Sequence, residues 1–130
     1  ATRGNPDCHV ILRGSNSGPN YSAEHVTAAS EKLIAHGLPA RIMIDCSHGN
    51  SSKDYRKQPQ VADYIAQQIE NGNATIFGLM MESHLIGGRQ DLKAHCSLTY
   101  GQSITDACLG WEETVPVIHR LAEAVRKRRR

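Results

Sequence analysis

Three short apolar runs recur along the chain, and each leads to an ionisable side chain. The runs cover residues 8–13, 40–47 and 76–82, so they begin 32 and 36 residues apart. Each is short, partly β-branched and bounded by turn residues, which is typical of a core strand rather than a helix. The spacing fits right-handed strand–helix units, and we therefore expect an α/β fold with three parallel strands in one sheet.

Apolar residues at helical spacing follow each run. The pattern predicts helices near residues 22–36, 59–71 and 114–128. Their expected inward stripes are Val26, Ala29 and Leu33 in the first helix, Val61, Ile65 and Ile69 in the second, and Ile118, Leu121 and Val125 in the third. We expect Pro116 in the first turn of the last helix. Residues 86–102 form a stretch longer than most connections, which favours a functional loop.

Three parallel strands do not close a barrel. They leave two unpaired edges and, once helices cover one face, an uncovered opposite face. The first strand also begins almost at the start of the chain, which is rare for a free-standing domain. We therefore expect part of a larger (β/α) barrel, or a chain that assembles with another copy. A complete small three-layer domain is the less favoured alternative, because too few helices remain to cover both faces.

Composition and charge exclude several classes of protein. The chain has 130 residues, 39% of them hydrophobic and 22% charged, with a formal net charge of +2 that the tail 126–130 largely explains. A basic helix end usually complements the helix dipole. Because no aromatic-interleaved basic face accompanies it, we expect no nucleic-acid binding. No apolar stretch reaches the length of a membrane span and no signal peptide is evident, so we expect no membrane association and a cytoplasmic location.

The four cysteines, Cys8, Cys46, Cys96 and Cys108, show no CxxC spacing. Two of them lie in or beside predicted strands. We therefore expect buried, reduced thiols, with disulfides as the minority alternative.

Four side chains form the candidate site. The carboxyl ends of parallel strands meet at one edge, which brings Arg13, His48 and Glu82 together, and Asp106 follows the long loop. A guanidinium suits phosphate or carboxylate. One imidazole nitrogen with carboxylate oxygens suits Mn²⁺, Fe²⁺, Co²⁺ or Zn²⁺. The set predicts an anionic substrate beside a divalent metal ion, although separate surface ion pairs and a histidine that merely ends a strand remain open alternatives.

At these residues longer motifs become recognisable, in order along essentially the whole chain. They are Gly4-Asn5-Pro6-Asp7-Cys8-His9, Ile11-Leu12-Arg13-Gly14, Pro19-Asn20-Tyr21, Ile44-Asp45-Cys46-Ser47-His48-Gly49-Asn50-Ser51-Ser52-Lys53, Met81-Glu82-Ser83-His84-Leu85 and Tyr100-Gly101-Gln102-Ser103-Ile104-Thr105-Asp106-Ala107-Cys108. The sequence resembles class I 3-deoxy-D-arabino-heptulosonate 7-phosphate (DAHP) synthase. The resemblance implies that residues 1–130 are the C-terminal part of a single (β/α)8 TIM-barrel catalytic domain, its last three βα units.

The resemblance also implies a reaction and roles for the site residues. Enzymes of that family condense phosphoenolpyruvate with erythrose 4-phosphate in the first step of the shikimate pathway and release phosphate. Arg13 then corresponds to a phosphoenolpyruvate-binding arginine. His48, Glu82 and Asp106 correspond to three of four metal ligands, with Asp106 also near the aldehyde substrate, so that His48 and Asp106 are the expected catalytic residues. We expect a homo-oligomer.

Other parts of the family's site have no match in this chain. The fourth ligand is a cysteine on an early strand, and further phosphate-binding lysines and arginines also lie upstream; Cys46 is not assigned to replace that ligand. The chain alone is therefore expected to be inactive. Ser15 and Gly49 depart from the usual pattern beside site residues. Two alternatives stay open: a non-catalytic metal- or anion-binding piece that self-associates, and the related synthase that uses arabinose 5-phosphate.

Overall fold

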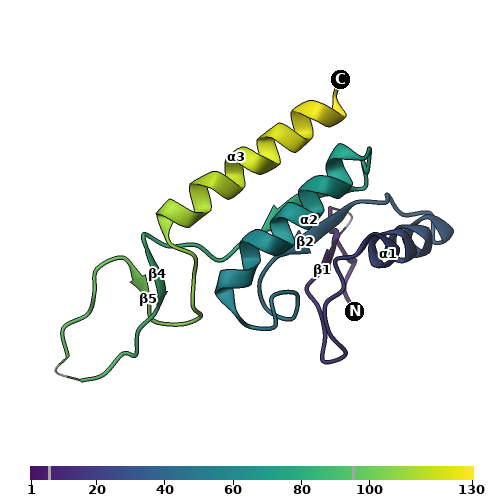
Figure 1. Ribbon diagram of the computed structural model, residues 1–130. Helices are drawn as coiled ribbons and strands as arrows, with labels where there is room; N and C mark the ends of the chain where they lie inside the picture. Colours follow the sequence, from purple (N-terminus) through teal and green to yellow (C-terminus); the bar gives the residue numbers. More distant parts are fainter. Residues whose placement is uncertain (6, 95) are drawn as a thin grey trace.

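The computed structural model describes residues 1–5, 7–94 and 96–130. Pro6, in the first motif, and His95, in the segment predicted as a loop, lie outside the described residues. Strands β1 (Val10–Leu12), β2 (Ile42–Asp45) and β3 (Ile76–Met80) form one parallel sheet in the order β1-β2-β3 (Figure 1). The α/β class and the three parallel strands are confirmed, and each strand is shorter than its predicted range.

Three long helices accompany the sheet, as the sequence predicts. They are α1 (Ala23–Ala35), α2 (Gln58–Glu70) and α3 (Trp111–Arg128). Helix α1 begins after Ser22, whose hydroxyl accepts the backbone N–H of His25. A short 3₁₀ turn, η1 (Tyr55–Lys57), leads into α2. The predicted boundaries agree with the structure to within one residue for α1 and α2.

Helix α3 begins three residues earlier than predicted, and the expected place of Pro116 in its first turn is wrong. Gly110 precedes the helix, and its backbone N–H donates to the Glu113 carboxylate at 2.9 Å. The Thr114 hydroxyl donates to the carbonyl of Gly110 at 2.9 Å. Because these bonds start the helix at Trp111, Pro116 lies inside it. The glycine offered no side-chain signal for a helix start, which is why the sequence placed the start at Thr114.

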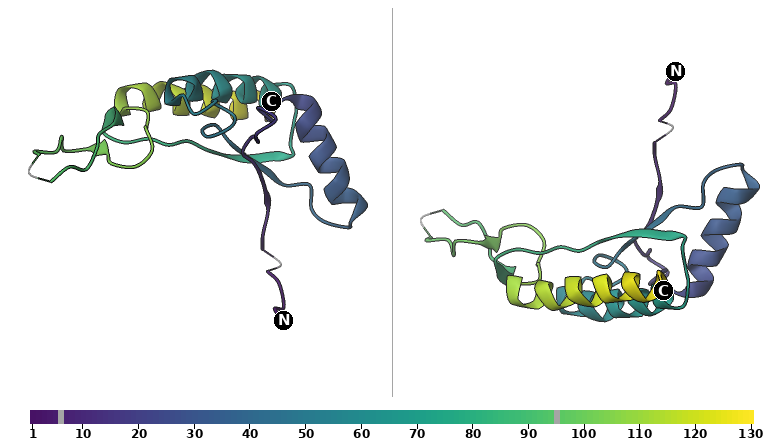
Figure 2. Two further views of the ribbon diagram at one scale, coloured as in Figure 1. Left: turned by 90° about the horizontal axis from the view of Figure 1, so that it is seen from below. Right: turned by 90° about the horizontal axis from the view of Figure 1, so that it is seen from above.

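Helices α2 and α3 lie together over one face of the sheet, and α1 lies to the side of them (Figure 2). The core lies between the helices and the sheet. The expected stripes of the first two helices are confirmed. Val26, Val61, Ile65 and Ile69 are buried with Ile42 and Ile44, and Ala29 and Leu33 pack against them. In α3 the predicted stripe is wrong at Ile118, which is 49% exposed. Val117 and Ala124 are buried instead, because α3 lies along α2 and turns this side of the helix toward it.

The other face of the sheet is uncovered in the part of the chain that the structure describes (Figure 2). Side chains alternate along a strand, so Ile11 of β1 and Met43 of β2 share this face at one level of the sheet. Gly78 of β3 pairs at that level and also faces Met43. Ile11 is 49% exposed although it is a core-type residue. The strand pattern predicted this exposed apolar face.

The segment predicted as a loop over residues 86–102 contains two short strands. These are β4 (Ile86–Arg89) and β5 (Gln102–Ser103), which pair in parallel as a separate small sheet. The side chain of Gln90 donates to the carbonyls of Thr99 and Gln102 and accepts the N–H of Thr99. Strands β4 and β5 lie to one side of α1, α2 and α3 in Figure 1. Strand β5 has only two residues, and β4 has glycine at two of its four positions, so neither shows strand periodicity.

All four cysteines are free, as predicted. Their expected burial is confirmed for Cys46 and wrong for Cys8 and Cys96, which are exposed, whereas Cys108 is half-buried. None of the helices in the described ranges combines the length and the apolar character needed to span a bilayer.

Candidate functional site

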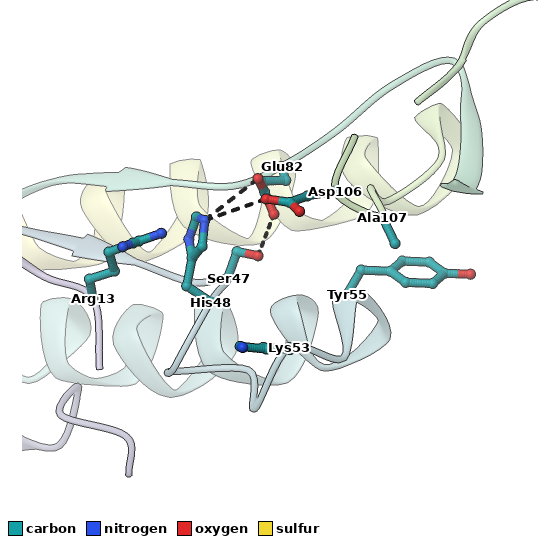
Figure 3. Close-up of a pocket in the computed structure, with 8 residues that line it drawn as sticks. All are labelled: Arg13, Ser47, His48, Lys53, Tyr55, Glu82, Asp106 and Ala107. Atoms are coloured by element: carbon teal, nitrogen blue, oxygen red, sulfur yellow. Dashed lines mark hydrogen bonds and ion pairs between the residues drawn. The ribbon is translucent and has the colours of Figure 1, made fainter. Parts of the chain in front are cut away.

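One pocket, of about 310 Å³, lies at the carboxyl edge of the sheet (Figure 3). The four side chains singled out from the sequence all line it. The complete lining is Arg13, Ser47, His48, Lys53, Tyr55, Glu82, Asp106 and Ala107. Residues from the ends of β1, β2 and β3 and from the segment after β5 therefore converge, as the parallel topology predicts.

His48 lies in a turn beyond the end of β2, not on the strand itself. The strand ends at Asp45, although the N–H of Cys46 still donates to the carbonyl of Met80 at 2.9 Å. His48 has a left-handed backbone with φ of +50°. The turn is closed by the N–H of Lys53, which donates to the carbonyl of His48 at 2.8 Å. This turn, rather than strand alternation, aims the imidazole into the pocket.

The imidazole is oriented by a buried carboxylate. Nδ1 of His48 lies 2.8 Å from Oδ2 of Asp45, and Asp45 is only 2% exposed. The backbone N–H of Ser47 donates to Oδ1 of the same carboxylate at 2.8 Å. A carboxylate accepts hydrogen bonds, so this contact is a hydrogen bond when Nδ1 carries the ring proton. The other ring nitrogen, Nε2, is left facing the pocket.

Three ligand-type atoms meet at this point. Nε2 of His48 lies 3.8 Å from Oε1 of Glu82 and 3.9 Å from Oδ2 of Asp106 (Figure 3). Donor atoms of all three residues lie within 4.8 Å of one another. These separations are too long for hydrogen bonds. The two separations from Nε2 are compatible with atoms that share one ion at bond lengths of about 2.0–2.2 Å. The full spread of 4.8 Å is wider than such an ion allows, so the two carboxylates would have to draw together around it. One imidazole nitrogen with two carboxylates is a donor set that fits a divalent metal ion.

Glu82 is held on both its side chain and its backbone. The hydroxyl of Ser47 donates to Oε2 at 2.6 Å. The side-chain amide of the fully buried Gln58 accepts the Glu82 N–H at 2.8 Å and donates to its carbonyl at 3.1 Å. Asp106, in the bend after β5, is the least enclosed of the three, with 71% of its side chain exposed.

The loop that carries Arg13 is held by its neighbour Gly14, while the Arg13 side chain is 63% exposed. The Nε atom of Arg13 lies 3.7 Å from Oδ2 of Asp45. The next residue, Gly14, touches the turn that carries His48: a Cβ atom on Gly14 would lie 2.5 Å from the carbonyl carbon of Gly49. Gly14 also donates its N–H to the side chain of Asn20 at 2.7 Å.

Asn50 joins the loops after β1 and β2. Its Nδ2 group donates to the carbonyl of Leu12 at 3.0 Å and to that of Asp45 at 2.8 Å. Its Oδ1 atom accepts the N–H of Asn20 at 2.8 Å. The buried amide of Asn50 therefore joins the Arg13 and His48 loops, in addition to the contact between Gly14 and Gly49. Gly49, one of the departures from the family pattern, lies at this contact between the loops.

Five residues at or beside the pocket received no role in the sequence analysis. Three of them belong to the motif Ile44–Lys53, namely Asp45, Ser47 and Lys53, and the other two are Tyr55 and Gln58. The signal available for Asp45 was its charge at the end of an apolar strand. Lys53 has a left-handed backbone with φ of +61° and adds a second cation to the pocket lining. Gln58 opens α2 and gave no signal, because its contact with Glu82 depends on the packing of α2.

Cys46 is not available as a ligand. Burial, with a smaller effect from the charge of Asp45, raises the pKa of its thiol to about 12. The side chain packs among Ile42, Ile44 and the other core residues. A metal ligand must be a thiolate, so this cysteine is a core residue.

Comparison with known proteins gives a consistent result. The family model described as "DAHP synthetase I family" matches residues 1–118. The tyrosine-inhibited phospho-2-dehydro-3-deoxyheptonate aldolase of Schizosaccharomyces pombe is 56% identical over 132 residues, which cover 98% of this chain and 36% of that protein. The Phe-sensitive phospho-2-dehydro-3-deoxyheptonate aldolase of Escherichia coli K12 is 53% identical over 128 residues, which cover 98% of this chain and 36% of that protein.

A solved structure shares the fold. The phospho-2-dehydro-3-deoxyheptonate aldolase of Francisella tularensis superposes with a TM-score of 0.93 at 52% sequence identity, over 99% of this chain and 37% of that one. The chain thus spans just over a third of the length of the relatives that it matches.

Proposed function

The chain belongs to the DAHP synthetase I family, and from this premise we propose that it forms the C-terminal part of the catalytic domain of a DAHP synthase. In that role residues 1–130 are the last three βα units of a (β/α)8 barrel. The reaction is the condensation of phosphoenolpyruvate with erythrose 4-phosphate, with release of phosphate. The observation that carries the proposal is the convergence of His48, Glu82 and Asp106 within 4.8 Å in the pocket that Arg13 also lines.

His48, Glu82 and Asp106 are proposed to hold a divalent metal ion, with Mn²⁺, Fe²⁺, Co²⁺ and Zn²⁺ all compatible with one nitrogen and two oxygen donors. A metal ion in this position supplies Lewis-acid chemistry, either on the aldehyde oxygen or on a bound water. The protein's part is to fix the ligands: Asp45 orients the imidazole, and Ser47 orients the carboxylate of Glu82.

The anionic substrates are proposed to meet the cationic side of the pocket. The guanidinium of Arg13 can bind a carboxylate or phosphate through paired N–H groups. Lys53 lines the same pocket and adds a compact positive charge. Asp106 is close enough to His48 to take part in both metal and aldehyde binding, at 3.9 Å from its Nε2. Formation of a carbon–carbon bond requires both substrates to be held in register, which is the task of these groups.

A chimaeric enzyme tests the function. Residues 1–130 replace the matching segment of the Phe-sensitive enzyme of Escherichia coli, to which they are 53% identical. We expect the chimaera to release phosphate only when both substrates and a divalent metal ion are present. The same chimaera with His48→Gln should lose this activity, and one with Glu31→Gln, on the exposed side of α1, should keep it. An inactive, correctly folded chimaera would contradict the proposal.

Two other readings have distinct outcomes in the same assay. Arabinose 5-phosphate in place of erythrose 4-phosphate should give no comparable turnover; efficient use of it would indicate the related synthase. The 130-residue chain alone is expected to release no phosphate, because it offers three ligands and one arginine of the family's site. A non-catalytic, self-associating role would be favoured if the chain bound metal but the chimaera stayed inactive. We also propose self-association and a cytoplasmic location, in keeping with the biosynthetic role of the family.

A further inference from the structure

We propose that Asp45 is a positioning residue that fixes the tautomer of His48 for metal binding. This inference rests on the proposed function, because it concerns the same pocket. Asp45 is the last residue of β2 and is 2% exposed, although it carries a charge. A buried carboxylate is costly unless it is paired and hydrogen-bonded, so its partners indicate why it is there.

Both oxygens of Asp45 are used, and by different partners. Oδ1 accepts the backbone N–H of Ser47 at 2.8 Å. Oδ2 lies 2.8 Å from Nδ1 of His48 and 3.7 Å from Nε of Arg13. A single oxygen therefore lies between the proposed metal ligand and the proposed anion-binding group. Figure 3 shows the guanidinium of Arg13 pointing toward the imidazole of His48.

The contact with His48 determines which ring nitrogen can bind a metal ion. With the proton on Nδ1, the lone pair of the neutral imidazole is on Nε2. That atom faces Glu82 and Asp106. With the proton on Nε2 instead, an N–H group would point at the two carboxylates and the metal position would be blocked. Partners of this kind, outside the ligands themselves, commonly change metal affinity 10- to 100-fold.

The substitution Asp45→Asn distinguishes a role in fixing the tautomer of His48 from a role in packing. Asparagine keeps the shape of the side chain but offers one acceptor oxygen and one NH₂ donor group. The backbone N–H of Ser47 can only donate, so the side-chain oxygen of the asparagine stays on this N–H. The NH₂ group of the asparagine then takes the place of Oδ2 and faces Nδ1 of His48. Asp45→Asn should therefore move the proton of His48 to Nε2. The charge that faces Arg13 is lost in the same substitution.

The experiment is long-range ¹H–¹⁵N NMR of the imidazoles in the full 130-residue chain, without metal, with the pH raised until the spectra no longer change, so that every ring observed is neutral and its tautomer can be read. The chain contains two internal references. Nδ1 of His36 lies 2.8 Å from the carbonyl of Lys32, so His36 carries its proton on Nδ1. Nδ1 of His84 accepts the N–H of Leu85 at 2.8 Å, so His84 is protonated on Nε2. His48→Gln identifies the signals of His48.

In the unsubstituted chain we expect the ¹⁵N shifts of the His48 ring to follow those of His36, with the proton on Nδ1. After Asp45→Asn we expect them to follow those of His84, with the proton on Nε2. Asp63→Asn is the matched control, because Asp63 pairs with Arg120 away from the pocket. This control should leave His48 unchanged. Titration with Co²⁺ should show a 10- to 100-fold loss of affinity for Asp45→Asn and no change for Asp63→Asn.

The unsubstituted chain alone decides the first part: a proton on Nε2 of His48 would overturn the proposal, even if Asp45→Asn failed to fold. An unchanged tautomer and unchanged Co²⁺ affinity in a folded Asp45→Asn chain would overturn it as well. If the tautomers behave as expected but the unsubstituted chain takes up no Co²⁺, the role of Asp45 in fixing the tautomer is supported and the proposed metal site is wrong.

Discussion

The hydroxyl of Ser47 donates to Oε2 of Glu82 at 2.6 Å. This bond joins the turn after β2 to the residue that follows β3, and it leaves Oε1 of Glu82 facing Nε2 of His48 at 3.8 Å. Because the serine uses one carboxylate oxygen, the other is presented to the pocket in a fixed direction. Ser47 itself is buried, so this direction is not a feature of a mobile surface side chain.

Removal of this hydroxyl should weaken metal binding. In Ser47→Ala the carboxylate of Glu82 loses a charge-assisted hydrogen bond, a type worth about 1.5–3 kcal/mol. We expect the affinity for Co²⁺ to fall by about tenfold, in line with other partners of metal ligands. Isothermal titration calorimetry measures this affinity. Ser52→Ala, in the exposed part of the same turn, is the control, and an equal loss in both variants would show that the turn rather than the hydrogen bond is responsible.

The contact between Gly14 and Gly49 should be intolerant of any side chain on Gly14. In Gly14→Ala the new Cβ atom would lie 2.5 Å from the carbonyl carbon of Gly49, and this clash is with backbone. Both Gly14 and Gly37 have left-handed backbones, with φ of +76° and +69°, but Gly37 has nothing within 4 Å of such an atom.

Gly37→Ala is therefore a matched control for Gly14→Ala. Each variant pays about 1–2 kcal/mol for its backbone conformation. Gly14→Ala should lose a further 1–3 kcal/mol or so from its free energy of unfolding, because the loops must separate. Urea denaturation measures both values. Equal destabilisation of the two variants would mean that the loops of Arg13 and His48 do not touch in solution.

The sequence was sufficient for the sheet and most of the helices, because these depend on local periodicity. Val61, Ile65 and Ile69 repeat at helical spacing and are all buried. It failed where the deciding contact is distant or the local signal is weak. The start of α3 depends on Gly110, and the inward side of α3 depends on how α3 lies against α2. The paired strands β4 and β5 have too few residues for any periodicity.

In the candidate site, too, the features that depend on local sequence were predicted and those that depend on distant contacts were not. The parallel arrangement predicted that Arg13, His48 and Glu82 would meet, since each follows a strand of one sheet, and the pocket contains all three. The groups that orient them were not predicted. Gln58 reaches Glu82 through the packing of α2, and Asp45 reaches Nδ1 of His48 only because the turn adopts a left-handed backbone at His48.

The buried thiol of Cys46 should make the fold sensitive to alkaline pH. Burial raises its pKa to about 12, whereas an unfolded cysteine titrates near 8.5. The folded state therefore keeps a proton that the unfolded state loses, and stability falls as pH rises from about 9 to 12. The limiting slope for one such group is about 1.4 kcal/mol per pH unit. Denaturation of the unsubstituted chain and of Cys46→Ala across this range should give a steeper loss for the former; parallel curves would contradict it.

The carboxylate of Glu70 should make the fold sensitive to acid. A hydrogen bond from Nη1 of Arg120 at 2.5 Å, with Lys127 at 3.2 Å, lowers the pKa of Glu70. Its contribution is therefore present above the unfolded pKa of about 4.3 and is lost as pH falls through the lower folded value.

Glu70→Gln tests this link between α2 and α3. At pH 7 its melting temperature should be below that of the unsubstituted chain, and the difference should shrink as pH falls below about 4. Glu123→Gln is the control, because the pair that Glu123 forms with Lys127 at 3.6 Å is exposed on both sides. A difference that is the same at all pH values would show that the ion pair does not contribute.

Calorimetric titration of Co²⁺ into the 130-residue chain tests most directly whether His48, Glu82 and Asp106 form one metal site. We expect about one ion per chain, a large loss of affinity in each of His48→Gln, Glu82→Gln and Asp106→Asn, and unchanged binding in the control Glu112→Gln. Uptake of Co²⁺ that none of the three substitutions alters would remove these residues from the metal site and contradict the proposed function.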